Sequence, residues 1–407
     1  MAGEILVIGG GIAGLTAAVE IAETGYDVIL VEKNPYLGGR VAQLNKYFPK
    51  MCPPYCGLEI FFKRIKTNPK IKIFTNAEVV NVSGEAGNFE VTVKIKPRYV
   101  NENCTACGKC VEVCPVERPN DFNFGMDKTK AIYLPNEISI PFIYCIDDKY
   151  CNKCGECVKV CKYNAINLDD TEKTMKLNVS AIIVATGWKP YDATKLDNLG
   201  YGKYPNVITN MELERLASPN GPTKGKIQTK DGRPIQKVAF VQCAGSRDEN
   251  HLPYCSAICC LASMKQAMYI REQYPDAKIY IFYIDIRAFG RYEDFYAKVA
   301  EDPNIFFIKG KVAKVEEQNG KLIVTAEDVE SGVKHREEVD LVVLATGMQP
   351  SSADYKIPGI EYDEYGFVKE KPGIIPAGVA AQPLEVARVN ESATAAALKA
   401  IQIARRC

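Results

Sequence analysis

A glycine-rich turn between two apolar segments constrains the fold of this chain more than any other feature. Ile5–Ile8 predicts a buried strand, Ala13–Ala22 has helical spacing, and Val28–Val31 predicts a second strand. The turn has the spacing G-x-G-x-x-G, with its glycines at Gly9, Gly11 and Gly14. In this context the glycines permit a tight turn, close approach of a pyrophosphate and close helix packing. The pattern predicts a dinucleotide-binding Rossmann unit whose helix N-terminus faces the phosphates.

Further residues extend the expected cofactor site. Glu32 follows the second strand directly, where its carboxylate is placed to accept a hydrogen bond from a ribose hydroxyl. The segments "GGR", "AIIVATGWKP", "LVVLATGMQP" and "GIIPAGVAAQP" resemble the FAD-contacting segments of two-dinucleotide flavoproteins. That resemblance implies FAD, with contacts from Gly38, Gly39, Arg40, Ala185, Thr186, Gly187, Thr346, Gly347 and Gly378. Many such flavoproteins have Gly-Asp at the last of these positions, and the aspartate contacts the ribityl chain, but Val379 follows Gly378 here and cannot make that contact.

Two cysteine runs interrupt the predicted flavin domain. Each has the spacing C-x2-C-x2-C-x3-C of a two-cluster bacterial ferredoxin, in which the fourth cysteine of one run binds the cluster of the other. We therefore assign one [4Fe–4S] cluster to Cys104, Cys107, Cys110 and Cys161. The second cluster takes Cys151, Cys154, Cys157 and Cys114. Zinc is the alternative, but zinc sites use two C-x2-C pairs rather than eight cysteines in this order.

A third group of cysteines follows another apolar segment, Val238–Val241. A nicotinamide-binding domain would have G-x-G-x-x-G here, but the chain has "CAGSRD", and Gly245 alone cannot hold a pyrophosphate. We interpret the loop as a third [4Fe–4S] site, formed by Cys243, Cys255, Cys259 and Cys260. The last two would begin a helix whose dipole favours thiolates. The alternative is core cysteines with one reactive thiol. A consequence of the cluster hypothesis is that the chain binds NAD(P)H poorly.

Bulk composition limits the classes of function. Lys and Arg total 51 and Asp and Glu total 50, so no net field attracts nucleic acid or anionic lipid. No apolar run reaches the roughly 18 residues that a membrane helix needs, and the N-terminus lacks a secretory pattern. We expect a cytoplasmic protein that contacts a membrane only through another protein of its complex. The sixteen cysteines, at ferredoxin spacing in a long chain, favour clusters over disulfides.

The segments "QCAGSRDE" and "YCSAICC" resemble the A subunits of heterodisulfide reductases, which are FAD and iron–sulfur electron carriers. Longer segments, among them "LGGRVAQLNKYFPKMCPPYCGLEI" and "PNVITNMELERLASPNGPT", more closely resemble the A subunits of quinone-interacting membrane-bound oxidoreductases (Qmo). The Qmo resemblance covers essentially the whole chain. It implies electron transfer between the quinone pool and adenylylsulfate (APS) reductase in sulfate reduction, on the cytoplasmic face of the membrane. It also implies two partners in the complex, a second flavoprotein subunit together with a haem-bearing membrane subunit.

Two alternatives remain open beside that function. One is the A subunit of a heterodisulfide-reductase-type complex that carries out flavin-based electron bifurcation. The other is a self-sufficient NAD(P)H oxidoreductase, which the missing second glycine motif disfavours.

The predicted fold is α/β, a two-dinucleotide Rossmann-type flavoprotein with a two-cluster ferredoxin insert. We expect the flavin domain at 1–97, 171–235 and 346–407, the insert at 98–170, and a second Rossmann-like domain with the third cluster at 236–345. The remaining polar candidates are weaker. Lys46 and Tyr47 are expected at the surface, His251 in a loop, and the roles of the remaining cysteines stay open: Cys52, Cys56, Cys145 and Cys407.

Overall fold

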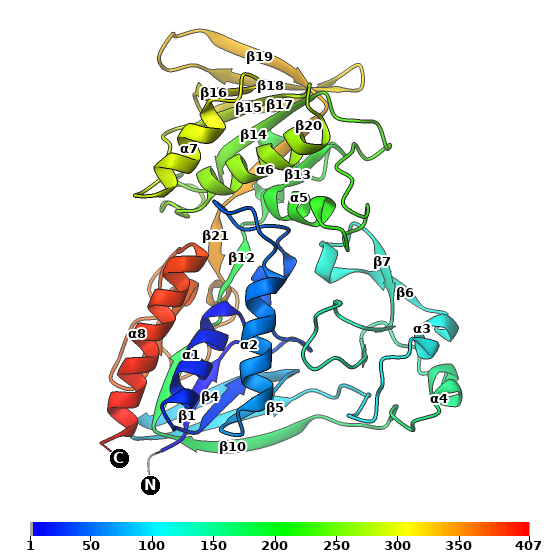
Figure 1. Cartoon of the computed structure of the whole chain (residues 1–407), viewed down its shortest axis with the longest axis vertical. Coiled ribbons are helices and arrows are strands. Elements are labelled where there is room, and N and C mark those ends of the chain that lie inside the picture. The colour runs from blue at the N-terminus through cyan, green and yellow to red at the C-terminus, as the bar shows by residue number, and fades with distance from the viewer. Residues whose placement is uncertain (1–2, 407) are drawn as a thin grey trace. The chain divides into compact units, whose positions relative to one another are not determined.

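The chain folds into two compact units, and the computed structural model describes residues 3–406 (Figure 1). The first unit contains the chain up to Ala42, Tyr55–Trp188, and the chain from Pro350 onward. The second unit contains Gln43–Pro54 and Lys189–Gln349. Two short strands, β12 (Trp188–Pro190) and β21 (Met348–Pro350), lie where the chain passes between them.

A five-stranded parallel sheet forms the centre of the first unit, in the order β22-β11-β1-β2-β3. Its strands are β1 (Ile5–Ile8), β2 (Val28–Val31), β3 (Ile71–Phe74), β11 (Ala181–Val184) and β22 (Ile374–Pro376). The helices of this unit are α1 (Ile12–Glu23), α2 (Tyr55–Thr67) and α8 (Val386–Ala404). Figure 1 shows α1 packed between the other two. All four residues of β1 and of β2 are buried, as continuous apolar runs in parallel sheets predict.

A three-stranded antiparallel sheet packs on one face of the parallel sheet. It has the order β10-β5-β4, with β4 (Ala77–Glu85), β5 (Asn88–Ile95) and β10 (Lys173–Val179). Alternate residues of these strands, such as Val91 and Val93, join Leu6 and Ile182 in one buried core. Burial alternates along β5, which is the pattern of a strand with one solvent face.

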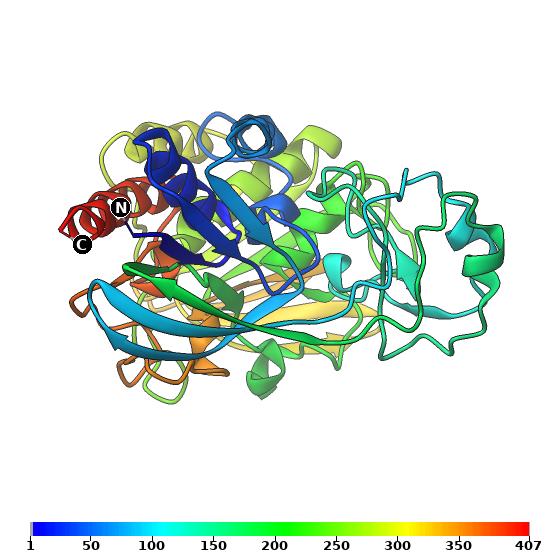
Figure 2. The same cartoon turned by 90° about the horizontal axis from the view of Figure 1, so that it is seen from below.

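The ferredoxin insert lies between β5 and β10. Figure 2 shows these two strands leading into it from the antiparallel sheet. Its elements are short: α3 (Lys109–Val113), β6 (Glu117–Pro119), β7 (Lys128–Lys130), β8 (Ile132–Tyr133), β9 (Cys145–Ile146) and α4 (Glu156–Val160). The helices α3 and α4 pack against each other.

The second unit repeats the plan of the first. Its parallel sheet has the order β13-β20-β14-β15-β16, with β13 (Val207–Thr209), β14 (Lys237–Ala244), β15 (Lys278–Tyr283), β16 (Ile305–Lys309) and β20 (Leu341–Thr346). One face packs against α5 (Asn210–Ala217), α6 (Cys259–Gln273) and α7 (Tyr292–Ala300). The other packs against an antiparallel sheet of β17 (Val312–Gln318), β18 (Lys321–Glu327) and β19 (Lys334–Val339).

The shared plan makes β14 the counterpart of β1, because each is the middle strand of its parallel sheet. The cysteine loop after β14 therefore occupies the position that the glycine loop occupies after β1. The predicted α/β fold, with two Rossmann-like sheets and a ferredoxin insert, is confirmed.

The units divide the chain differently from the predicted domains in three stretches. Residues 43–54, 189–235 and 346–349 were predicted to belong to the flavin domain, but they lie in the second unit. The reason is that β13 pairs with β20 and α5 packs against α6, both inside the second unit. No helix within residues 3–406 is long and apolar enough to cross a membrane.

Candidate cofactor sites

The three glycines of the first turn have different local surroundings. Gly9 has φ +111°, and a Cβ there would lie 2.3 Å from the carbonyl oxygen of Ala185. A Cβ on Gly14 would lie 1.8 Å from the carbonyl oxygen of Gly9. At Gly11 the nearest neighbour of a Cβ would be the Cα of Gly39, at 3.8 Å. Gly9 and Gly14 are thus required by the fold, whereas the open space beside Gly11 fits a ligand that approaches the backbone.

The N-terminus of α1 is prepared for an anion. Gly11 caps the helix without a side-chain hydrogen bond, and no acidic residue lies in the first turn. The N–H groups of that turn carry a partial positive charge. Gly38 lies beside this turn, because its N–H donates to the carbonyl oxygen of Gly10 at 2.8 Å. The arrangement fits the pyrophosphate of a dinucleotide.

Glu32 is buried at the end of β2 and bonds to the glycine turn. Its Oε2 accepts from the N–H of Gly10 at 2.6 Å, and its Oε1 accepts from the backbone and side-chain N–H groups of Asn34 at 2.8 and 2.7 Å. Burial raises the pKa of Glu32, although these hydrogen bonds oppose the shift. Each carboxylate oxygen has two acceptor positions, so Oε2 can accept a ribose hydroxyl as well.

The first Ala-Thr-Gly segment lies against the glycine turn, as the contact between Gly9 and Ala185 requires. Within residues 3–406 no group hydrogen-bonds the buried Oγ1 of Thr186, which is the kind of atom a cofactor satisfies. Gly378 also lies at this place, since a Cβ there would be 3.0 Å from that of Ala13. These placements fit FAD, while the individual contacts stay predictions.

Arg40 lies between the glycine pair and the insert. Its Nε donates to the carbonyl oxygen of Trp188 at 3.2 Å, and its guanidinium carbon is 5.7 Å from the ring centroid of Phe124. Burial lowers the pKa of Arg40. These contacts connect the expected flavin site to the linker of the ferredoxin insert, which is the segment between Cys114 and Cys151.

The two cysteine runs have the same backbone conformation. The residue before the second cysteine is left-handed in both, with φ +54° at Ala106 and +55° at Lys153. A left-handed glycine follows in both, Gly108 at +84° and Gly155 at +79°, and a five-residue helix begins at the next residue. The runs therefore form a structural repeat that wraps each group of sulfurs in the same way.

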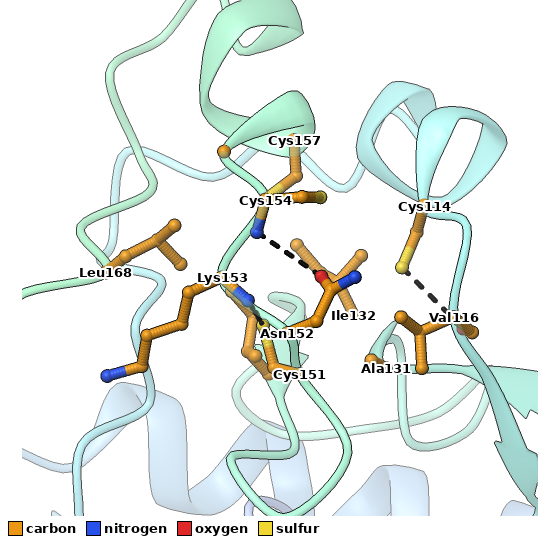
Figure 3. Close-up of a pocket in the computed structure, with 12 residues that line it drawn as sticks. Cys114, Val116, Ala131, Ile132, Cys151, Asn152, Lys153, Cys154, Cys157 and Leu168 are labelled. Carbon is orange, nitrogen blue, oxygen red and sulfur yellow. Dashed lines mark hydrogen bonds between the residues drawn. The ribbon is translucent and has the colours of Figure 1, made fainter.

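A pocket brings together the four cysteines predicted for the second cluster (Figure 3). It contains about 320 Å³ of space without atoms, part of it open to solvent, and Cys114 joins the three cysteines of the second run: Cys151, Cys154 and Cys157. Burial, and then the neighbouring thiols of Cys151, Cys154 and Cys114, raise the pKa of Cys157. The crossover of Cys114 is the arrangement that a two-cluster ferredoxin requires.

The first group is more open. Burial and the adjacent thiol of Cys104 raise the pKa of Cys110 to about 12. Cys104 and Cys161 pack in the same apolar cluster as Cys110, and Cys107 is exposed. All four cysteines predicted for the first cluster thus belong to the compact insert.

The third group lies at the end of β14 and the start of α6. Cys243 has φ +56° and is buried, as are Cys259 and Cys260, while Cys255 is half-buried. Burial, followed by the thiols of Cys243, Cys260 and Cys255, raises the pKa of Cys259 well above its ordinary value. Four cysteines separated by up to 17 positions in the sequence are therefore neighbours. In the described part of the chain, no three His, Cys, Asp or Glu side chains are placed to hold a single metal ion.

The second Ala-Thr-Gly segment lies beside this third group. The thiol of Cys259 points to the carbonyl oxygen of Thr346 at 3.9 Å, and a Cβ on Gly347 would lie 2.1 Å from Oγ of Ser246. The structure thus places Thr346 and Gly347 in the second unit, against the cysteine loop. Their assignment to the flavin stays a prediction.

The weaker candidates have ordinary partners. His251 Nδ1 and the hydroxyl of Tyr191 are 2.8 Å apart, and Lys46 pairs with Glu272 at 2.8 Å. Cys145 is buried with its sulfur 3.7 Å from the carbonyl oxygen of Tyr133. Cys52 and Cys56 are exposed, Tyr47 is half-buried, and Cys407 lies outside the described residues.

Sequence reasoning missed one buried ionic group in the insert. Arg118 is 2% exposed and pairs with Asp121 and Asp147. A comparison of the two runs could have indicated it. Four positions after its last cysteine, Cys114, the first run has the charged Arg118, whereas the second run has Ala165 four positions after Cys161.

Comparison with known proteins agrees with this geometry. Residues 7–72 match the family described as an NAD(P)-binding Rossmann-like domain, and residues 97–117 match a 4Fe-4S binding domain. An iron-sulfur A subunit (form 2) of the CoB–CoM heterodisulfide reductase of Methanopyrus kandleri is 44% identical, over 97% of this chain and 63% of the relative. This chain is homologous to the A subunits of the heterodisulfide reductases.

A second such homologue is the A subunit of the H2:CoB–CoM heterodisulfide, ferredoxin reductase of Methanothermobacter thermautotrophicus, 40% identical over 98% of this chain. The chain spans about 63% of the length of both heterodisulfide reductase subunits. The thioredoxin reductase of Lactococcus lactis has the same fold, with a TM-score of 0.55, 14% identity and 100% of both chains covered.

These relatives bear on the choice between the Qmo function and the heterodisulfide-reductase alternative. They are subunits of oxidoreductases, and the family matches support an electron-transfer protein with a flavin and iron–sulfur clusters. Their names point to the heterodisulfide-reductase alternative rather than to Qmo, and they mention neither quinone nor APS reductase.

Proposed function

We propose that this chain is the electron-transfer core of a heterodisulfide-reductase-type complex, with one FAD and three [4Fe–4S] clusters. FAD exchanges electrons singly or in pairs, whereas each cluster carries one electron at a time. The residues proposed to hold FAD are those of the glycine turn, Glu32 and Thr186. The twelve sulfurs described above are proposed to hold the clusters.

The observation that carries the proposal is the grouping of the cysteines by fours. Cys114 leaves its own run to join the second run, as a cubane with crossed ligands needs. In the second unit, four cysteines occupy the position of a phosphate-binding loop. We infer that a cluster site takes the place of a nucleotide site there.

Contacts inside the first unit support exchange of electrons between flavin and insert. The N–H of Leu37 donates to the carbonyl oxygen of Ile140 at 3.1 Å, and the rings of Tyr36 and Phe122 are 5.8 Å apart. The linker of the insert therefore packs directly on the segment beside the glycine pair.

Bifurcation is the finer form of this proposal, since the Methanothermobacter relative is named for both a heterodisulfide and a ferredoxin. The test is purification of the native complex, with iron, flavin and haem quantified and its subunits identified. We expect flavin and iron without haem, and subunits of heterodisulfide-reductase type. A haem-bearing membrane subunit would favour the quinone-linked function instead.

A further inference from the structure

The two predicted cluster sites of the insert are closed by different contacts. Each site needs a cysteine from the other run, so a segment after one run must lie beside a segment before the other. At the first site, backbone hydrogen bonds join these two segments directly. Val100 and Ile166 form an antiparallel bridge, and the N–H of Asn101 donates to the carbonyl oxygen of Ala165 at 2.9 Å.

At the second site an inserted strand separates the equivalent segments. The N–H of Ala131 donates to the carbonyl oxygen of Val116 at 3.1 Å, and the N–H of Asp147 donates to that of Ala131 at 2.8 Å. The next residues of the inserted segment form β8, which pairs with β9. The segment after Cys114 therefore reaches the segment before Cys151 only through an intervening strand.

The side chain of Arg118 crosses that strand. Arg118 lies four residues after Cys114, and Asp147 lies four residues before Cys151. The guanidinium carbon is 4.2 Å from the ring centroid of Tyr133, and Nε is 3.3 Å from Oδ2 of Asp147. The carbonyl oxygen of Asp147 in turn accepts the N–H of Cys151 at 3.0 Å.

Further contacts fix the guanidinium in place. Its Nη1 donates to Oδ2 of Asp121 at 2.9 Å and to the carbonyl oxygen of Pro119 at 3.0 Å. A buried charge is costly unless it is paired, so loss of either carboxylate partner would leave the buried guanidinium of Arg118 poorly compensated. The matching position of the other run is Ala165, which is buried in the apolar core of the insert.

We infer that Arg118 is a positioning residue that holds Cys114 and Cys151 in register across the inserted strand, so that the second cluster can bind. This inference rests on the proposed function, because it concerns a cluster in that pocket. The first site does not depend on Arg118, because backbone hydrogen bonds close it.

The test compares variants of the full chain, purified without oxygen, by iron content and by electron paramagnetic resonance of the reduced protein. Arg118→Met keeps an unbranched apolar side chain and removes the guanidinium with its charge, and Asp147→Asn removes the charge of its partner. We expect each to lose about four irons per chain, the content of one cubane. The spin-coupled spectrum of two adjacent reduced clusters should become that of a single one.

Further variants test whether the iron loss is specific to the contact between Arg118 and Asp147. Lys130→Met removes the 3.4 Å ion pair with Glu117 on neighbouring strands and should keep all iron. Arg118→Lys keeps the charge and should retain more of the second cluster than Arg118→Met. The double variant of Arg118→Met and Asp147→Asn should lose no more iron than either single variant, because both act on one contact.

Full iron and an unchanged coupled spectrum in Arg118→Met would overturn the inference. Loss of both clusters would overturn it too, because the first site is closed independently. Cys154→Ser separates this result from the proposed function. If Cys154→Ser loses about four irons and Arg118→Met loses none, only the inference fails; if Cys154→Ser loses none, the proposed second cluster itself fails.

Discussion

The sulfur of Cys255 accepts a hydrogen bond from the backbone N–H of Ala257 at 3.3 Å, with Ala257 in the left-handed region at φ +58°. In the ferredoxin insert, the sulfur of Cys151 accepts from the N–H of Lys153 at 3.4 Å, with φ +55°. The same local turn thus presents a cysteine at the second and third proposed cluster sites. Backbone N–H groups that point at a sulfur stabilise its thiolate.

Replacing Cys255 by serine therefore tests the third cluster. We expect Cys255→Ser to lose about four irons per chain and to retain FAD, because the glycine turn is in the other unit. Iron and flavin are quantified after anaerobic purification. The exposed Cys56 provides the control, since Cys56→Ser should change neither quantity. An unchanged iron content in Cys255→Ser would contradict the proposal of a third cluster.

Gly11 offers a test of the FAD site that does not disturb the fold. Its φ is −77° and a Cβ has no neighbour closer than 3.8 Å, so alanine fits the protein but fills the space of the pyrophosphate. Gly11→Ala should weaken FAD binding at least tenfold, about 1.4 kcal/mol. Flavin retained after dialysis measures this, and circular dichroism monitors folding.

Two other glycines serve as controls for Gly11→Ala. Gly57 in α2 has open space around it and no positive φ, so Gly57→Ala should keep FAD. Gly14→Ala should instead prevent folding of the first unit, because of the 1.8 Å contact with Gly9. Full FAD binding by folded Gly11→Ala would exclude this turn as the pyrophosphate site.

The second unit should not use NAD(P)H. Cys259 is buried at the start of α6, and a Cβ on Gly245 would lie 2.4 Å from the ring of Tyr191. The loop thus lacks the open glycine backbone that a pyrophosphate needs. Anaerobic mixing with NADH should leave the flavin absorbance unchanged, while dithionite should bleach it. Rapid bleaching by NADH would restore the self-sufficient oxidoreductase hypothesis.

Asp340 ties β20 to the start of β14 and predicts a pH dependence of stability. Its Oδ2 accepts from the N–H groups of Gln236 and Lys237 at 2.8 and 2.9 Å. Burial acts to raise the pKa of Asp340, but hydrogen bonds from Lys321 and from these N–H groups lower it overall. A lowered pKa in the folded state stabilises the fold above the ordinary pKa of aspartate, about 3.9. That contribution disappears as pH falls through the folded-state pKa.

Asp340→Asn should therefore lower the free energy of unfolding by about 1–3 kcal/mol at neutral pH. The difference from the unmodified protein should shrink in acid, and urea unfolding followed by circular dichroism measures both. The exposed Asp276 is the control, with an expected change within about 0.5 kcal/mol. An equal difference at both pH values would contradict the assigned charge.

Local patterns made much of the fold predictable. The glycine turn, the buried strands Ile5–Ile8 and Val28–Val31, and the ferredoxin spacing depend on residues close in sequence. The grouping of Cys114 with the second run was also predictable, because the spacing itself implies the crossover. These features need no knowledge of distant contacts.

Long-range contacts account for what the sequence did not reveal. The segment Gln43–Pro54 joins the second unit because buried Glu214 and Lys265 hold its backbone: Glu214 Oε2 accepts the N–H of Asn45, and Lys265 Nζ donates to the carbonyl oxygen of Lys46. Charged residues are usually solvated, so their burial is invisible in a linear pattern. Arg118, which lies between the two cysteine runs, was missed for the same reason.

The central claim is that twelve cysteine sulfurs of this chain hold three cubanes and that the glycine turn of the first unit holds one flavin. The most direct measurement is the ratio of iron and FAD to protein in an anaerobic preparation of the full chain. The account predicts about twelve irons and about one FAD per chain. About eight irons with full flavin would contradict the third cluster, and about four or fewer would contradict the ferredoxin assignment as well.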